Sequence, residues 1–146
     1  GQLRGDRRHG QGKYTFANSD FYEGQWAEGK AHGQGTFSSR ESKYTGHWDA
    51  DLKHGLGEER FEDGSVYSGE FKQGYRHGRG VMTWPNGSVY EGDFVHNNQE
   101  GHGVLRWKKG HMYEGQWENN FMHGTGRYDF PDGSRYEGQY VSNLKA

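Results

Sequence analysis

The sequence contains no cysteine, only two prolines and few aliphatic residues among its 146 positions. The lack of cysteine excludes disulfides, thiolate metal ligands and a cysteine nucleophile, and it fits an intracellular protein. No apolar run approaches the roughly 20 residues of a transmembrane helix, and no secretory signal is visible. The formal net charge of -2 provides no general attraction to nucleic acid or to an anionic membrane. We therefore expect no nucleic-acid partner.

Hydrophobic residues are also scarce, at 29% of the chain, and the mean hydropathy is -1.29. These values alone are typical of disordered chains. Disordered chains are poor in aromatic residues, however, and 16% of this sequence is aromatic. The aromatic residues and the 26 glycines also keep a strict register along the chain, which predicts an ordered protein.

Tyrosines recur at intervals of 22 or 23 residues, and each opens a Tyr-x-Gly-x-aromatic pentapeptide. A fixed short period is typical of stacked repeats, because one copy is too small to bury its own apolar face. We expect one array over residues 1–146. Its parts are a partial repeat 1–21, full repeats 22–43, 44–66, 67–89, 90–112 and 113–135, and a partial terminal repeat 136–146.

Each repeat predicts two short strands with turns between them. The pentapeptide alternates apolar and polar residues, and a Gly-x-Gly eleven residues after the tyrosine opens a second alternating segment. Seven residues after each of the first five pentapeptide tyrosines lies a residue that suits a tight turn with positive φ. These residues are Gly29, Asp51, Gly74, Asn97 and Asn120. We expect less regular turns in the links 17–20 and 38–42, which lack glycine. We also expect an irregularity where Glu100 replaces the usual histidine, and a loss of register after Tyr140.

The spacing of the aromatic residues places nearly all of them on one face of a single-layer sheet, where the strand glycines leave room for neighbouring rings. Charged and polar residues such as Glu23, Glu70, Asp93 and Arg127 fall on the opposite face. We predict an all-β antiparallel meander with a groove lined by aromatic residues. The groove residues are Tyr22, Trp26, Tyr44, Trp48, Tyr67, Phe71, Trp84, Tyr90, Phe94, Trp107, Tyr113 and Trp117. Such a groove could also hold a peptide or an extended strand of a partner.

The segments 22–35 and 113–126, which read Tyr-Glu-Gly-Gln-Trp followed by His-Gly-x-Gly, resemble the membrane occupation and recognition nexus (MORN) repeat. The resemblance covers about residues 7–140 and implies an elongated, twisted antiparallel β-meander with two strands per repeat. No kinase or methyltransferase segment accompanies the repeats. The chain is therefore most similar to the C-terminal repeats of protist cytoskeletal scaffolds, which form homodimers through those repeats.

The resemblance implies a scaffold that pairs with itself as an antiparallel homodimer and contacts other cytoskeletal proteins. The expected location is the cytoplasm, in association with the cytoskeleton and peripherally at a membrane. We expect the dimer contact at Tyr136, Tyr140, Val141 and Leu144, because no further repeat covers these aromatic rings.

An alternative function is a membrane adaptor that binds phosphoinositide lipids through basic residues. The candidates are Arg4, Arg7, Arg8, Lys13 and Lys30. A second basic group comprises Arg106, Lys108, Lys109 and His111. Acidic residues are interleaved with both groups and each group is small, so we favour ordinary solvated turns for both.

Other patterns carry little chemistry. The histidines before Gly-x-Gly lie about 10 Å apart from repeat to repeat, too far to share one zinc, and we expect them to hydrogen-bond the hairpin backbone. A metal held between chains and a pH-sensitive surface remain alternatives. The Gly-x-Gly motifs lack the following helix of a phosphate loop. No carboxylate pair is isolated in a pocket, so we predict no enzyme, no cofactor and no resident metal.

Overall fold

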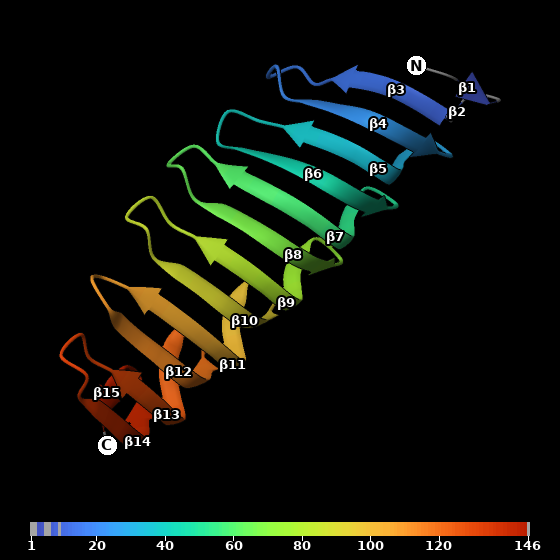
Figure 1. Ribbon diagram of the computed structural model, residues 1–146. Coiled ribbons are helices and arrows are strands. Elements are labelled where there is room, and N and C mark those ends of the chain that lie inside the picture. The colour runs from blue at the N-terminus through green and yellow to red at the C-terminus, as the bar shows by residue number, and fades with distance from the viewer. Residues whose placement is uncertain (1–2, 5–6, 9, 146) are drawn as a thin grey trace. The chain divides into compact units, whose positions relative to one another are not determined.

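The computed structural model describes residues 3–4, 7–8 and 10–145, and the side chains of residues 10–143. It divides into two compact units, Gly1–Tyr75 and Arg76–Ala146. Each unit is an open antiparallel β-meander, as the sequence predicts, with strands that follow one another in chain order (Figure 1). Helix is absent from the described residues, so none of them forms a helix that is long and apolar enough to cross a membrane.

The strands of the first unit are β1 (Leu3–Arg4), β2 (Arg7–Arg8), β3 (Gly10–Thr15), β4 (Phe21–Ala27), β5 (Lys30–Ser38), β6 (Ser42–Asp49), β7 (Leu52–Phe61) and β8 (Val66–Lys72). Those of the second are β9 (Tyr75–Thr83), which begins at the last residue of the first unit, β10 (Val89–Val95), β11 (Asn98–Trp107), β12 (His111–Glu118), β13 (Phe121–Asp129), β14 (Arg135–Val141) and β15 (Leu144–Lys145). In repeat terms, the pentapeptide lies in the first strand of each hairpin and Gly-x-Gly in the second.

Tight two-residue turns close the hairpins within each repeat. In the turn between β4 and β5, Glu28 has φ 53° and Gly29 has φ 80°, and both positive values are typical of a type I′ turn. The predicted positive-φ positions Asp51, Gly74, Asn97 and Asn120 are confirmed. The expected loss of register after Tyr140 is wrong, because Ser142 and Asn143 form the same turn and Leu144 pairs with Val141.

Of the two links that we predicted to be less regular, one keeps the regular turn and the other does not. In link 17–20, Ser19 adopts the positive φ that glycine has in the regular links. Its N–H donates to Phe16 O, which is the same bond that Gly64 N–H makes to Phe61 O in the link 62–64. The expectation of an irregular turn there is therefore wrong. In the shorter link 38–42, a different turn forms, in which Ser39 N–H donates to Ser42 O at 2.8 Å.

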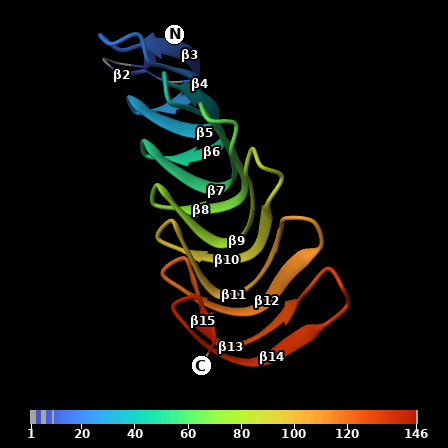
Figure 2. The ribbon, with the colours of Figure 1, turned by 90° about the vertical axis from the view of Figure 1, so that its left-hand side faces the viewer.

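A bulge in the hairpins β4–β5, β6–β7, β10–β11 and β12–β13 explains the first glycine of the Gly-x-Gly motif. Between β4 and β5, Gly24 pairs with Gly35 and Trp26 with Ala31, so residues 32–34 lie opposite Gln25 alone. Gly33 makes this detour with φ 70°, and Gln25 Oε1 accepts the Gln34 N–H at 2.6 Å. Bulges bend strands, and Figure 2 shows the ribbons of β11–β14 bent along their length. The Glu100 copy keeps the bulge, with Gly101 at φ 86°, so the predicted irregularity there is wrong.

A row of glycines runs across each sheet beneath the tyrosine rings. Gly24 pairs with Gly35, and Gly35 pairs in turn with Gly46. A Cβ on Gly35 would collide with the Tyr22 ring and hydroxyl group. The Tyr22 hydroxyl donates to Gln25 O at 2.8 Å, and the equivalent tyrosines make the same bond. The glycines are thus required because the rings lie directly on bare backbone.

Alternating rings form a ladder along this side of the sheet, which we call the aromatic face. Tyr22 contacts Trp26 at 5.0 Å and Trp48 at 5.2 Å between ring centroids, and Tyr44 contacts Trp48 at 5.0 Å, all edge to face. The second unit repeats the pattern from Tyr90 to Tyr140. Each such pair contributes about 0.5–1.5 kcal/mol beyond the area it buries. The ladder is therefore the core of each unit.

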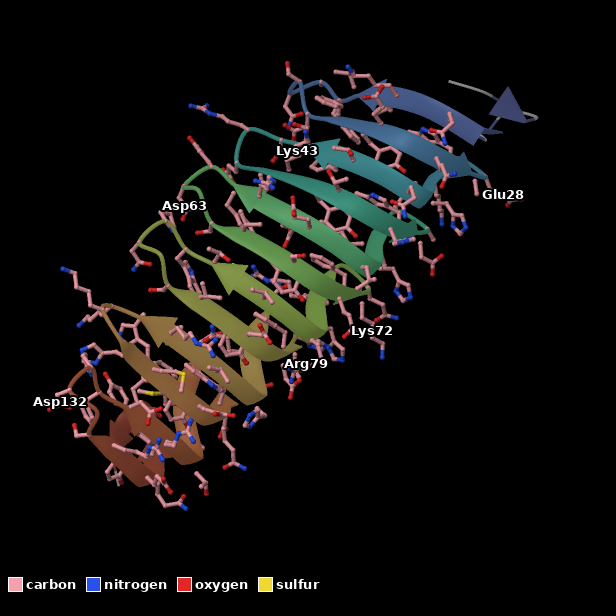
Figure 3. All side chains as sticks on the ribbon, in the orientation of Figure 1. Glu28, Lys43, Asp63, Lys72, Arg79 and Asp132 are labelled. Atoms are coloured by element: carbon pink, nitrogen blue, oxygen red, sulfur yellow. The ribbon has the colours of Figure 1, made fainter. Side chains whose placement is uncertain are left out.

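The opposite side of each sheet, the charged face, carries Glu23, Glu70, Glu91 and Arg127, as predicted. The two kinds of turn lie at opposite ends of the strands. In the first unit, Figure 3 shows Asp63 of a link between repeats at one end, and Glu28 and Lys72 beside hairpin turns at the other.

Candidate functional site

Most of the predicted groove residues belong to the core instead of lining an open surface. Ten of the twelve are no more than 9% exposed, and they form the ring ladder: Tyr22, Trp26, Tyr44, Trp48, Tyr67, Phe71, Tyr90, Phe94, Tyr113 and Trp117. Trp84 and Trp107, in the second strands of their repeats, are half-buried. On the aromatic face, space for a ligand remains where the ladder is incompletely covered.

The first unit has such a space, which we call the first hollow. It has a volume of about 460 Å³. Its lining comprises Tyr14, Phe16, Tyr22, Trp26, Gly29, Ala31, Phe37, Trp48, Asp51 and Lys53. Phe16 is 43% exposed at its border, and the Phe16 ring lies 4.8 Å from the Tyr14 ring and 6.0 Å from the Phe37 ring. Rings therefore make up most of the lining, and two charged groups complete it.

The second unit has a comparable space, the second hollow, with a volume of about 510 Å³. Its lining comprises Trp84, Asn86, Ser88, Gln99, Leu105, Trp107, Trp117, Asn120, Met122 and Asn143. None of these side chains is charged. All five tryptophans of the chain thus line one of the two hollows, two in the first and three in the second.

Asp51 is held in place by the preceding hairpin. Its Oδ1 accepts the Ala31 N–H at 2.7 Å, and its own N–H donates to Ala31 O at 3.0 Å. Three asparagines make the same pair of bonds at the same place in later repeats: Asn97 to Arg76, Asn120 to Gln99 and Asn143 to Met122. Gly74 keeps only the backbone bond, to Lys53 O at 2.9 Å. The turn residue thus fastens each repeat to the one before it.

An ion pair stands beside Asp51 on the aromatic face. Lys53 Nζ lies 2.6 Å from Glu59 Oε2, and Glu59 is 8% exposed. The same ammonium group lies 5.3 Å from the centroid of the Tyr44 ring. Glu59 stands at the repeat position that Phe37 and Leu105 occupy elsewhere. Because Glu59 neutralises Lys53, Asp51 is the unbalanced charge in the lining of the first hollow.

Burial raises the pKa of the ladder tyrosines. It brings the pKa of Tyr22 and that of Tyr113 to about 12. The nearby Asp51 carboxylate contributes to the Tyr22 shift, which places its negative field in the first hollow. Tyr44 and Tyr90 are raised further for the same reason. These hydroxyl groups stay neutral at physiological pH.

The basic residues that we predicted to bind a lipid are not brought together where they can be placed. The side chains of Arg4, Arg7 and Arg8 lie outside the described residues. Lys13 is stacked over the Phe21 ring, 4.4 Å from its centroid, and its cross-strand neighbour is Glu23. Lys30 lies on another strand, beside the hairpin turn. Two strand spacings and about four residues separate the two lysines, a distance of roughly 16 Å.

The second basic group does gather. Arg106, Lys108, Lys109 and His111 line a hollow of about 500 Å³ at the link between β11 and β12, with Asn86, Gly87, Trp107, Gly110 and Met112. Arg106, Lys108 and Lys109 are exposed. Unlike Lys13 and Lys30, these residues share one hollow, the basic hollow.

The structure separates the residues predicted for a dimer contact. Tyr140 is 2% exposed, with its ring packed against Tyr113 at 5.1 Å and Tyr136 at 5.5 Å, so the expectation that it is uncovered is wrong. Tyr136 is half-buried, and Val141 is 54% exposed on the charged face. The Leu144 side chain lies outside the described residues. Phe121, on the neighbouring strand, is 46% exposed and was not predicted.

Two histidines of the row, His32 and His123, face carboxylates. His32 Nδ1 lies 3.8 Å from Asp49, and His123 Nε2 lies 3.2 Å from Glu118. The predicted hydrogen bonds to the hairpin backbone are not seen for His32, His54, His77 or His123, and His9 lies outside the described residues. Among residues with described side chains, no three His, Asp or Glu residues gather as metal ligands.

The geometry agrees with the comparison to known proteins. The MORN repeat family model matches residues 1–21, 22–41, 44–66, 67–89, 90–112 and 113–135. The chain therefore belongs to the MORN repeat family. MORN repeat-containing protein 3 of Xenopus laevis is 38% identical over 65 residues, which cover 39% of this chain and 27% of that protein. The match thus spans about a quarter of the relative.

Sequence reasoning missed Asp51, Lys53 and Glu59 as a group. A signal was present, because Glu59 replaces a large apolar residue at its repeat position and Asp51 replaces the glycine or asparagine of the other turns. The contact between Lys53 and Glu59 spans the bulge, which the spacing of the glycines did not reveal.

Proposed function

We propose that the chain is a protein-interaction module of a structural scaffold, and that it pairs with a second copy through the charged face of its C-terminal repeats. Membership of the MORN repeat family supports an interaction module or a membrane-associated one. Cytoskeletal partners and a location at the cytoskeleton follow from the resemblance to scaffold proteins, and they are part of this proposal.

The observation that carries the self-association is a pair of exposed apolar side chains. Phe121 is 46% exposed on β13 and Val141 is 54% exposed on the adjacent β14. Val141 follows the buried Tyr140 in its strand, so its side chain points to the charged face, and Phe121 precedes Met122, which pairs with Trp117 of the ladder. Exposed apolar side chains on adjacent strands favour association.

A two-fold pairing places this patch against its own copy, because an isologous contact uses the same surface twice. The interface shifts from Tyr140, which is buried, to Phe121 and Val141. Of the other residues predicted for the contact, Tyr136 lies on the aromatic face beside Tyr140, outside this patch, and Leu144 stays a prediction.

Light scattering after size exclusion, over a wide range of protein concentration, tests the pairing. We expect a dimer for the parent chain and a monomer for Phe121→Asp combined with Val141→Asp. The matched control is Leu52→Asp, because Leu52 is 46% exposed beside a hairpin turn of the first unit and lies outside the patch. A monomeric parent chain, or a dimer that survives the double change, would refute this interface.

A second candidate function is binding of phosphoinositide headgroups in the basic hollow at Arg106, Lys108 and Lys109. The convergence of these side chains favours it, since Lys and Arg both pair well with phosphate. Vesicles with and without phosphoinositide would report the binding. We expect Lys108→Glu combined with Lys109→Glu to abolish vesicle binding, and Lys13→Glu combined with Lys30→Glu to leave it unchanged. The opposite pattern would assign the lipid contact to the N-terminal basic residues.

Among the described side chains no catalytic arrangement supports an enzyme, and the interaction role agrees with the general character of the repeat family. The absence of activity stays a prediction.

A further inference from the structure

The first hollow carries a net negative charge on a lining of aromatic rings. Asp51 provides that charge, since Lys53 is paired with Glu59 at 2.6 Å. At the same repeat position, the second hollow has the neutral amides of Asn120 and Asn143. The molecule thus contains the same kind of hollow twice, once with a carboxylate and once without.

Ring faces attract cations, and a carboxylate beside them strengthens the attraction. Tyr14, Phe16 and Phe37 stand in the second-strand rows, and Trp26 and Trp48 in the ladder. Because cation–π attraction acts within about 6 Å of a ring centroid, a small cation inside the hollow would meet several rings at once.

The lining also selects among cations. A guanidinium group has five donors and needs several acceptors to replace its water. The hollow offers one carboxylate, and one of its oxygens already accepts the Ala31 N–H. A primary ammonium group has three donors and meets the same shortage. A trimethylammonium group has no donor, keeps its charge and presents methyl groups to the rings.

The charges around the hollow favour one of two molecules that carry a trimethylammonium group, phosphocholine and trimethylated lysine. Phosphocholine would bring a phosphate close to Asp51, and the cation in the lining, Lys53, is already neutralised by Glu59. A trimethylated lysine has an apolar stem instead of a phosphate. This stem can lie along Phe16, which is 43% exposed at the border of the hollow.

We propose that the first hollow binds the trimethylammonium group of a methylated lysine side chain on a partner protein, with Asp51 as the counter-charge. This site lies on the aromatic face of the first unit, apart from the self-association patch on the charged face of the second. It adds a chemically defined partner to the interaction module.

NMR of the tryptophan indole N–H groups tests the site, because the five tryptophans divide between the two hollows. The probe is Nα-acetyl-Nε-trimethyl-lysine amide. We expect the Trp26 and Trp48 signals to shift in a saturable way while those of Trp84, Trp107 and Trp117 stay in place. Equal shifts in both groups, or no shift at high probe concentration, would overturn the proposal.

Asp51→Asn is the decisive variant, since asparagine makes the same turn bonds at three other repeats and only the charge is lost. We expect at least a roughly tenfold loss of affinity. Unchanged affinity would contradict the role of Asp51. Phe16→Ala is a second variant at an exposed ring, and we expect it to weaken binding as well. Affinities for the unmodified lysine amide or for phosphocholine that match that of the probe would overturn the choice of methylated lysine.

Discussion

In the first unit, the aromatic hollow is bordered by Asp51 and by the Lys53–Glu59 pair, whereas the hollow of the second unit is lined by Gln99, Leu105 and Asn120. Beneath both hollows lies the same ladder, with ring centroids about 5 Å apart and edge-to-face geometry. The comparison teaches that the repeat fixes the ladder, while the residues around it differ in charge.

The largest effect is expected from alkali, because both units depend on neutral tyrosines. Burial raises the pKa of Tyr22 and Tyr113 to about 12, from about 10 in an unfolded chain. The unfolded chain therefore releases these protons first, so the stabilisation is complete below pH 10 and is lost as the pH rises to about 12. We expect the phenolate absorbance of the ladder tyrosines to appear together with loss of the circular dichroism signal. Phenolates that form near pH 10 in a folded chain would contradict this.

The next effect is on the glycine row. Gly35→Ala and Gly126→Ala place a Cβ against the rings of Tyr22 and Tyr113, and neither ring can move without leaving the ladder. We expect each change to lower the free energy of unfolding by more than about 3 kcal/mol. The control is Gly133→Ala, where nothing lies within 4 Å and only the φ of 89° is unfavourable, at a cost of about 1 kcal/mol. Urea unfolding measures all three, and equal losses would contradict the steric explanation.

The ion pair separates the two units. Lys53→Gln leaves the Glu59 carboxylate buried without its partner, and we expect a loss of about 3 kcal/mol. Lys53→Gln combined with Glu59→Leu copies Gln99 and Leu105 of the repeat 90–112. This double variant should unfold within about 1 kcal/mol of the parent chain. A double variant as unstable as the single one would contradict the view that Lys53 stabilises the fold only by neutralising Glu59.

The smallest effect concerns the turn residues. Asp51→Ala and Asn120→Ala each remove one hydrogen bond to the preceding hairpin, and we expect similar losses of about 1 kcal/mol in the two units. The reverse change is Gly74→Asn. It adds an amide where only the backbone bond to Lys53 exists, and a Cβ there meets Leu52 at an ordinary 3.7 Å. Gly74 has φ 88°, a backbone conformation that asparagine tolerates at Asn97 and Asn120, so we expect the new bond to exceed the strain by at most about 0.5 kcal/mol. Thermal unfolding compares the three variants.

The period of the tyrosines was enough to predict the strands, the hairpin turns and the two faces, because ring, glycine and turn positions are set by the backbone geometry of the repeat. The bulge at Gly33 was not predicted, since two glycines separated by one residue fit a regular strand equally well. Ser19 was also missed, because positive φ is uncommon for serine.

The candidate sites were harder to predict than the fold. The groove rings were identified correctly as one face, and their mutual packing buries most of them, which leaves little of the predicted groove open. Tyr140 was expected to be uncovered for want of a following repeat, yet Tyr113 and Tyr136 cover it from within the ladder. Asp51, Lys53 and Glu59 depart from the repeat pattern. The sequence shows these departures but not which of the residues lie close together, so it could not identify the site.

Exchanging the charge between the hollows tests most directly whether one carboxylate on the shared ladder decides where a cation binds. The double variant Asp51→Asn and Asn120→Asp is titrated with Nα-acetyl-Nε-trimethyl-lysine amide while the indole N–H signals are followed. We expect the response to move from Trp26 and Trp48 to the tryptophans of the second hollow, Trp84, Trp107 and Trp117. A response that stays with Trp26 and Trp48 would show that the rings alone select the ligand, and it would contradict the role given to Asp51.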